Sequence, residues 1–88
     1  MKVVFSAHAW ADYRHWCETD SKTLLRIITL IEECRRHPFK GSGKPEPLRG
    51  ELAGFWSRRI NQRDRLVYRV IGKDGDQRLE IAQCREHY

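Results

Sequence analysis

The chain carries a set of side chains whose chemistry suits the cleavage of RNA without a metal ion. Glu46 stands between two prolines, Arg65 begins an apolar run, and His87 is followed only by Tyr88. RNA brings its own nucleophile, because the ribose 2′-hydroxyl can attack the adjacent phosphate once a base removes its proton. The reaction then needs an acid for the departing 5′-oxygen and a cation for the charge on the phosphate. Glu46, His87 and Arg65 are candidates for base, acid and cation.

The sequence alone leaves the choice of base open, because several carboxylates lie outside the predicted helices. They are Glu46, Glu51, Asp64, Glu80 and Glu86. Glu46 is favoured because Pro45 and Pro47 hold its backbone extended, which lowers the entropy lost in positioning the carboxylate. A solvent-facing loop glutamate is the alternative. For the acid, the terminal carboxylate of Tyr88 would favour a protonated His87 if the two groups approach each other.

Other chemistries fit the sequence less well. Cys84 and His87 have a spacing seen in metal and thiol–imidazole sites, but residues three apart on a strand point to opposite faces. The three cysteines lie far apart and form no CxxC pair, which indicates reduced thiols. The glycines in "GSG" lack the spacing of a nucleotide-binding loop. We therefore expect no metal site and no cofactor.

Composition indicates a small basic protein. The 88 residues allow one domain, residues 1–88, and 40% of them are hydrophobic. Seventeen Lys and Arg against twelve Asp and Glu give a net charge of +5, which favours polyanionic partners, although a solvated, salt-bridged surface is the alternative. Arginine dominates the basic region between residues 35 and 69, and its planar group can grip a phosphate through two hydrogen bonds. The apolar run at residues 3–5 is too short for a signal peptide or a membrane span, so we expect a cytoplasmic protein without membrane contact.

The order of apolar patterns predicts a βααβββ chain. Residues 2–5 are typical of a strand, Ser6 can cap a helix that runs to about Thr19, and Asp20 or Ser21 can cap a second helix that ends before Pro38. The apolar stripes expected to face the core are Trp10, Tyr13, Trp16 and Cys17 on the first helix and Leu24, Leu25, Ile28, Leu30, Ile31 and Cys34 on the second. Residues 38–50 form a loop rich in proline and glycine, and "FWSRRI", "RLVYRVI" and "RLEIAQC" are predicted strands. We predict an α+β fold in which both helices pack on one face of a small, mainly antiparallel sheet.

Strand alternation predicts which side chains face the open side of this sheet. Leu66, Tyr68 and Val70 should face the helices, while Arg65 and Arg69 should face away from them; these residues lie in "RLVYRVI". In the last strand both the odd-numbered and the even-numbered positions carry apolar residues, so alternation leaves the direction of His87 open. A histidine near a chain end is commonly a loose surface residue, but a strand just before it would fix its position.

Longer stretches of the chain resemble a family of bacterial toxins. "FKGSGKPEPLRGELAGFWSRRI", "RLVYRV" and the ending "CREHY" have the order and spacing of the YoeB branch of the RelE-type toxins from toxin–antitoxin systems. The resemblance implies a RelE-like fold and a metal-free endoribonuclease that cuts messenger RNA in the ribosomal A site. It places the catalytic residues at Glu46, Arg65, His87 and Tyr88, with the Tyr88 ring holding or stacking on the nucleotide. The residues predicted to bind RNA are Lys44, Arg49, Arg58 and Arg59, and Arg49 stands where the family pattern has lysine.

The resemblance also implies partners, namely a cognate antitoxin with an acidic segment and the ribosome with its mRNA, and it is compatible with a homodimer. Two other functions remain open from the sequence. Toxins of the ParE kind share this layout but inhibit a topoisomerase, and a plain RNA-binding module would use its arginines without cleavage. Neither function requires Glu46 or His87, so replacing Glu46 by alanine distinguishes them from the ribonuclease.

Overall fold

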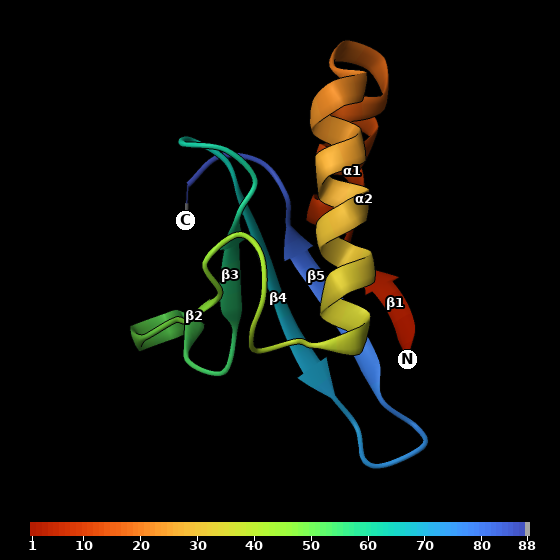
Figure 1. Cartoon of the computed structure of the whole chain (residues 1–88), viewed down its shortest axis with the longest axis vertical. Coiled ribbons are helices and arrows are strands. Elements are labelled where there is room, and N and C mark those ends of the chain that lie inside the picture. The colour runs from red at the N-terminus through yellow and green to blue at the C-terminus, as the bar shows by residue number, and fades with distance from the viewer. Residues whose placement is uncertain (88) are drawn as a thin grey trace.

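The computed structural model describes residues 1–87 and shows two helices beside a five-stranded sheet (Figure 1). The elements are β1 (Lys2–Phe5), α1 (Ala7–Thr19), α2 (Ser21–Arg36), β2 (Glu46–Pro47), the 3-10 turn η1 (Gly50–Leu52), β3 (Trp56–Arg59), β4 (Arg65–Ile71) and β5 (Arg78–Gln83). The strand order is β1-β5-β4-β3-β2, with β1 parallel to β5 and the other pairs antiparallel. The predicted α+β fold is confirmed. The short strand β2 inside the proline-rich loop was not predicted.

Caps set the bounds of both helices. The Ser6 hydroxyl accepts a hydrogen bond from the Ala9 N–H at 3.0 Å, as expected for the start of α1. Asp20 serves two helices at once, because its N–H donates to Trp16 O at the end of α1 and its carboxylate accepts from Thr23 N at the start of α2. These bonds from Thr23 lower the pKa of Asp20. At its other end α2 carries Arg35 and Arg36, whose charges complement the negative end of the helix dipole.

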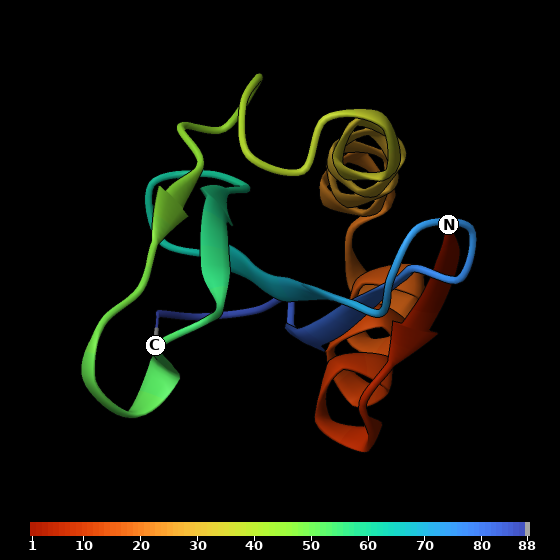
Figure 2. The same cartoon turned by 90° about the horizontal axis from the view of Figure 1, so that it is seen from below.

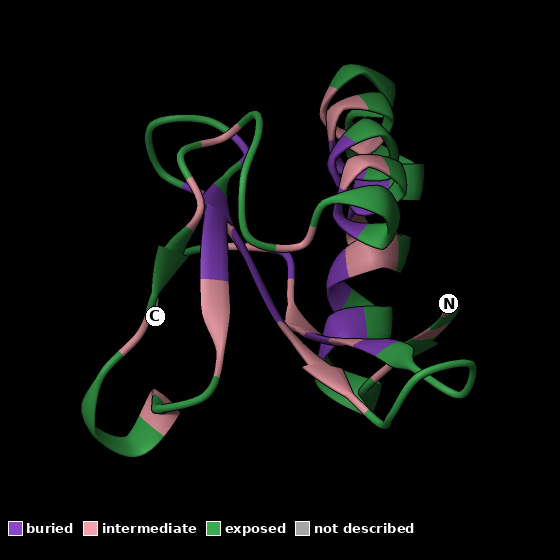
Figure 3. Cartoon of the chain, turned by 60° about the horizontal axis from the view of Figure 1, so that its bottom comes forward, coloured by how far each residue is buried: buried purple, intermediate pink, exposed green. Residues whose placement is uncertain are grey.

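The core lies between the helices and one face of the sheet. Ile27, Leu30 and Cys34 of α2 and Leu66 and Tyr68 of β4 are all fully buried. Figure 3 shows the same arrangement, with buried segments on β3, β4 and the inner sides of the helices. The prediction that alternate residues of β4 face the helices is confirmed. Neither helix is long and apolar enough to cross a membrane, and no other helix within residues 1–87 is either.

The two predicted apolar stripes are only partly buried. On α1, Trp16 is buried, but Trp10 is 52% exposed and stacks on Tyr13 with ring centroids 5.6 Å apart. On α2, Leu25 is 64% exposed and Ile28 is 37% exposed, so their assignment to the core was wrong. The two apolar residues lie on the part of α2 that the sheet does not cover.

The chain after β5 crosses to the side of the molecule that holds β2 and β3 (Figures 1 and 2). Helix α1 holds the start of this segment, because Trp16 Nε1 donates to Cys84 O at 2.8 Å and the Cys84 N–H donates to Asp12 Oδ2 at 3.1 Å. Glu86 then adopts a left-handed conformation with φ of 66°, which turns the chain before His87. The last strand thus ends at Gln83, and the tail that follows is fixed by its own hydrogen bonds.

Candidate active site

A pocket of about 210 Å³ brings together most of the residues selected from the sequence. It is lined by Lys44, Glu46, Ser57, Arg59, Arg65 and His87. These residues come from the loop before β2, from β2, β3 and β4, and from the tail after β5. Four separate stretches of the chain, namely residues 44–46, 57–59, 65 and 87, therefore converge on one small, polar depression.

Glu46 reaches this pocket because β2 pairs with β3. In the antiparallel register Glu46 lies opposite Ser57, and Pro47 lies opposite Trp56. The carboxylate is therefore carried by a strand rather than by a free loop. Sheet pairing adds to the restraint that the flanking prolines place on the backbone.

The other carboxylates considered as bases lie outside the pocket. Asp64 is buried, and its oxygens accept hydrogen bonds from Glu86 N at 2.7 Å and Asn61 Nδ2 at 3.0 Å. Glu80 is held by Arg78 and Arg69, whose hydrogen bonds lower its pKa. Neither Glu51 nor Glu86 lines the pocket. Of the five candidates, only Glu46 does.

Arg59 and Arg65 lie directly opposite each other on β3 and β4. Like charges in this position repel, so the pair destabilises the sheet unless an anion lies between them. Lys44 adds a third positive charge to the same pocket. Within residues 1–87, none of the observed ion pairs involves these three cations. The pocket is therefore suited to a phosphate group.

The side chain of Arg65 is oriented by the turn between β3 and β4. Its NH1 group donates to Asn61 O at 2.8 Å and to Asp64 O at 3.1 Å. A guanidinium has five N–H donors, and within residues 1–87 these bonds use only the NH1 group. The edge formed by Nε and NH2 has the geometry for two parallel bonds to a phosphate.

The buried Asp64 holds the residue that precedes His87. Asp64 Oδ1 accepts from the Glu86 N–H, and the Glu86 carbonyl accepts from the Arg65 N–H at 3.1 Å. One short segment therefore fixes the residue before His87 and the first residue of β4 together. These bonds hold the chain up to Glu86, and the next residue, His87, lines the pocket.

Two predicted RNA contacts lie elsewhere, and one pocket residue was missed. Arg58 is 0% exposed and points toward the helices, so the prediction that it contacts RNA needs correction. Strand alternation accounts for this, because Arg59 faces the pocket and its neighbour must face the other way. Arg49 is exposed beside η1 and does not line the pocket. Ser57 does line it, and its spacing of two from Arg59 was the available signal.

Two further predictions concern Tyr88 and the pair of Cys84 and His87. Tyr88 lies outside the described residues, so its predicted role stays a prediction. Burial raises the pKa of the Cys84 thiol to about 12, and the nearby Asp12 and Asp64 act in the same direction. A protonated, fully buried thiol is neither a nucleophile nor a metal ligand. Within residues 1–87 there is no cluster of three or more potential metal-ligating side chains.

Comparison with known proteins decides the family. The model of the YoeB-like toxins of bacterial type II toxin–antitoxin systems matches residues 5–88. This chain belongs to that family. The toxin YoeB of Streptomyces coelicolor is 52% identical over 88 residues, which is the full length of both chains.

Solved structures agree with this assignment of the YoeB-like toxin. A YoeB/ParE toxin from Agrobacterium tumefaciens superposes with a TM-score of 0.98 over the whole of both chains, at 51% identity. A YoeB dimer from Staphylococcus aureus has a TM-score of 0.89 at 38% identity, covering 100% of this chain and 98% of that one. The same coverage and identity hold for a heterotetrameric YoeB–YefM toxin–antitoxin complex from S. aureus, with a TM-score of 0.87. The RelE/ParE fold and the assignment as a toxin are therefore shown.

Proposed function

We propose that this toxin is a metal-independent endoribonuclease that cleaves messenger RNA in the ribosomal A site. The observation that supports this most strongly is the shared pocket of Glu46, Arg65 and His87, which join it from three different segments. Such a pocket combines a carboxylate, an imidazole and cations around a space suited to one phosphate. Membership of the family supports the ribosome as the proposed place of action.

In the proposed reaction, Glu46 takes the proton from the ribose 2′-hydroxyl. The 2′-oxygen forms a bond to phosphorus, and the bond from phosphorus to the 5′-oxygen breaks. His87 gives its proton to that oxygen, because imidazole is the side chain that can hold and release a proton in the neutral range. The products are a 2′,3′-cyclic phosphate and a free 5′-hydroxyl. Charge balances, since one proton is taken and one is given.

The cations stabilise the charge that accumulates on the phosphate during attack. Arg65 offers the edge formed by Nε and NH2, and the position of Arg59 directly across the strand pair suits a second contact. Lys44 at the rim supplies a point charge for a neighbouring phosphate. Tyr88 is proposed to stack on a base, as aromatic rings do with unstacked nucleotides. Arg49, on the exposed surface, is proposed as an outer contact to the RNA backbone.

The experiment that tests the proposal is cleavage of messenger RNA on programmed ribosomes in the presence of EDTA. We expect a cut in the A-site codon that leaves a 2′,3′-cyclic or 3′-phosphate. Glu46→Ala and His87→Ala should lose the cut, whereas the exposed Glu51→Ala should keep it. If the toxin arrests growth or binds ribosomes without any cut, it acts as a non-catalytic toxin, and a topoisomerase becomes the next target to assay.

We also propose a cognate antitoxin and a homodimer as partners. The S. aureus relatives form a complex with YefM and a dimer, respectively. The net charge of +5 favours an acidic antitoxin segment, and exposed apolar side chains such as Trp10, Leu25 and Phe39 provide surface for protein contacts. Light scattering of the toxin alone and with its antitoxin measures both assemblies.

A further inference from the structure

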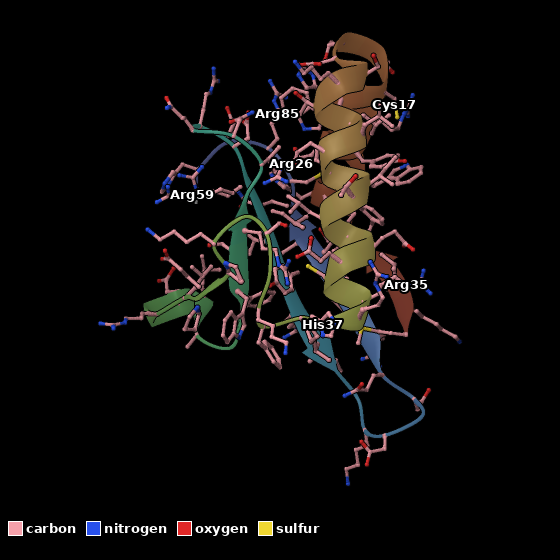
Figure 4. All side chains as sticks on the ribbon, in the orientation of Figure 1. Cys17, Arg26, Arg35, His37, Arg59 and Arg85 are labelled. Atoms are coloured by element: carbon pink, nitrogen blue, oxygen red, sulfur yellow. The ribbon has the colours of Figure 1, made fainter. Side chains whose placement is uncertain are left out.

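The loop between α2 and β2 is fastened to the sheet by a single buried arginine. Arg58 is 0% exposed, and its guanidinium lies among backbone carbonyls of this loop. The NH2 group donates to His37 O and to Lys40 O, the latter at 2.8 Å, and NH1 donates to Ser42 O at 3.2 Å. Figure 4 shows His37 at the end of α2, where the loop begins. Three loop carbonyls thus bind one side chain from β3.

Two further side chains complete the cluster around Arg58. Glu33 Oε1 lies 3.3 Å from NH1 and also accepts from the Ser42 N–H. Arg58 Nε donates to the Tyr68 hydroxyl at 3.2 Å, and that hydroxyl donates to Pro38 O at 2.6 Å. Burial raises the pKa of Tyr68 to about 12, so the hydroxyl keeps the proton it donates.

The guanidinium of Arg58 has its full set of hydrogen bonds. Nε makes one bond, and NH1 and NH2 make two each, which equals the five donors of an arginine. A lysine has three donors and a shorter reach, so it cannot replace this arrangement. No donor remains for RNA, so Arg58 contributes to the site only through the loop that it holds.

The loop backbone packs so closely against this cluster that a Cβ atom at two of its glycines would be too near its atoms. Gly41 has φ of 120°, and a Cβ there would lie 2.0 Å from Glu33 Oε1. Gly43 has φ of 81°, and a Cβ there would lie 3.1 Å from the Cβ of Arg58. Both glycines permit the close approach that the hydrogen bonds require.

The same loop leads directly into the pocket. Gly43 O accepts from the Arg59 N–H at 2.6 Å, and the next residue, Lys44, is held at φ of 54°. A left-handed conformation costs a residue with a side chain on the order of 1 kcal/mol and persists only where the surrounding structure enforces it. Lys44 lines the pocket, and Glu46 follows two positions later. The hydrogen bonds that hold residues 37–43 therefore also restrain the positions of the Lys44 and Glu46 side chains.

We propose that Arg58 is a positioning residue for RNA cleavage, which sets Lys44 and Glu46 in their productive geometry by holding the loop at residues 37–43. The proposal rests on the proposed ribonuclease function. Arg58 touches neither the RNA nor the pocket; it acts through the loop. Its loss should therefore lower the rate of the cleavage step more than the affinity for the ribosome, since the surface that binds RNA keeps its charges.

The test compares Arg58→Lys with a control in the core, Ile81→Val, which removes one buried methyl group from β5 and leaves the Arg58 cluster intact. Both are assayed on programmed ribosomes well below their melting temperatures. We expect Arg58→Lys to lower the saturated single-turnover rate about 10- to 100-fold, with the half-saturating toxin concentration little changed. Ile81→Val should cleave like the wild type. Glu33→Gln keeps an acceptor for the Ser42 N–H but loses the charge. Its cleavage rate should lie between those of Arg58→Lys and Ile81→Val.

Hydrogen exchange supplies a readout that does not depend on cleavage. In Arg58→Lys and Glu33→Gln the Ser42 and Arg59 amides should exchange faster, because the loop opens, while amides of β5 should not change. Equal cleavage by Arg58→Lys and Ile81→Val, or unchanged exchange at Ser42 and Arg59, would overturn the proposal. If Arg58→Lys does not fold, Glu33→Gln decides by the same two measurements. If the wild type makes no cut at all, the proposed function fails, and exchange alone then decides whether Arg58 holds the loop.

Discussion

Replacing Arg59 should make the toxin more stable and less active. Arg59 and Arg65 face each other across β3 and β4 in the pocket, so in the free toxin their charges repel. Arg59→Gln removes one of the two charges while keeping a polar side chain with an N–H donor. It leaves the backbone bonds of the residue intact, including the one that its carbonyl accepts from Arg26 NH2 at 3.2 Å. Figure 4 shows Arg26 reaching from α2 toward the strands.

The size of the gain follows from the geometry of a cross-strand pair. Opposed Cβ atoms lie about 5 Å apart, and we take about 7 Å between the two charged groups. Two unit charges at that distance in water repel by about 0.6 kcal/mol. Screening leaves about 0.5 kcal/mol at 10 mM salt and almost nothing at about 1 M. With a urea dependence of about 1 kcal/mol per molar, the unfolding midpoint should rise by about 0.5 M.

The assay is urea unfolding of Arg59→Gln beside a control, Arg63→Gln. Arg63 lies exposed in the turn between β3 and β4 and does not line the pocket. Arg63→Gln therefore removes the same formal charge from a neighbouring site. We expect Arg59→Gln to exceed the control in stability at low salt, and the difference to vanish at high salt. Cleavage of ribosome-bound message should fall about tenfold or more in Arg59→Gln only. A stability at low salt equal to or below that of Arg63→Gln would refute the reasoning.

Three further predictions concern the surroundings of the pocket. Glu33 has its pKa lowered, first by the bond from the Ser42 N–H and then by Arg58, so the folded state binds fewer protons than the unfolded state at this carboxyl. Its stabilising contribution is therefore present at pH 7 and is lost as the pH falls below the ordinary glutamate range. Between pH 7 and about pH 3, the free energy of unfolding measured with urea should fall more in the wild type than in Glu33→Gln. Asp64→Ala removes the acceptor of the Glu86 N–H and should lower the free energy of unfolding by about 2–4 kcal/mol and slow cleavage, whereas the exposed Asp74→Ala should do neither; equal effects would contradict the anchoring role. Removing residues 87–88 should abolish cleavage and leave the melting temperature nearly unchanged, because the Glu86 N–H still donates to Asp64 and the Glu86 carbonyl still accepts from the Arg65 N–H; normal cleavage by the truncated chain would contradict the role of His87.

The sequence predicted the helices and the main strands because their signals are local. Capping oxygens at Ser6 and Asp20 and the alternation in β4 each depend on a few neighbouring residues. Too many residues of the apolar stripe on α2 were assigned to the core. Apolar spacing shows which residues share a helix face but not how much of that face the sheet covers. Leu25 lies outside the covered part.

The pocket was predictable in its residue types but not in its boundaries. Glu46, Arg65 and His87 were selected by chemistry and by family resemblance, and the structure places them together. Arg58 was assigned to the RNA because it lies in the arginine-rich region between residues 35 and 69, next to Arg59. Only long-range contacts show that it is buried, since its partners belong to α2, β4 and the loop after α2.

In the proposed reaction, the decisive role is that of His87 as the acid for the departing 5′-oxygen. The direct test uses a message with sulfur in place of the bridging 5′-oxygen at the cut site, because a thiolate leaves without needing a proton. We predict that His87→Ala, inactive on normal message, regains cleavage on this substrate, whereas Glu46→Ala stays inactive because the 2′-hydroxyl still needs a base. If His87→Ala remains as impaired on the sulfur substrate as on normal message, His87 does not protonate the leaving group and the central claim is contradicted.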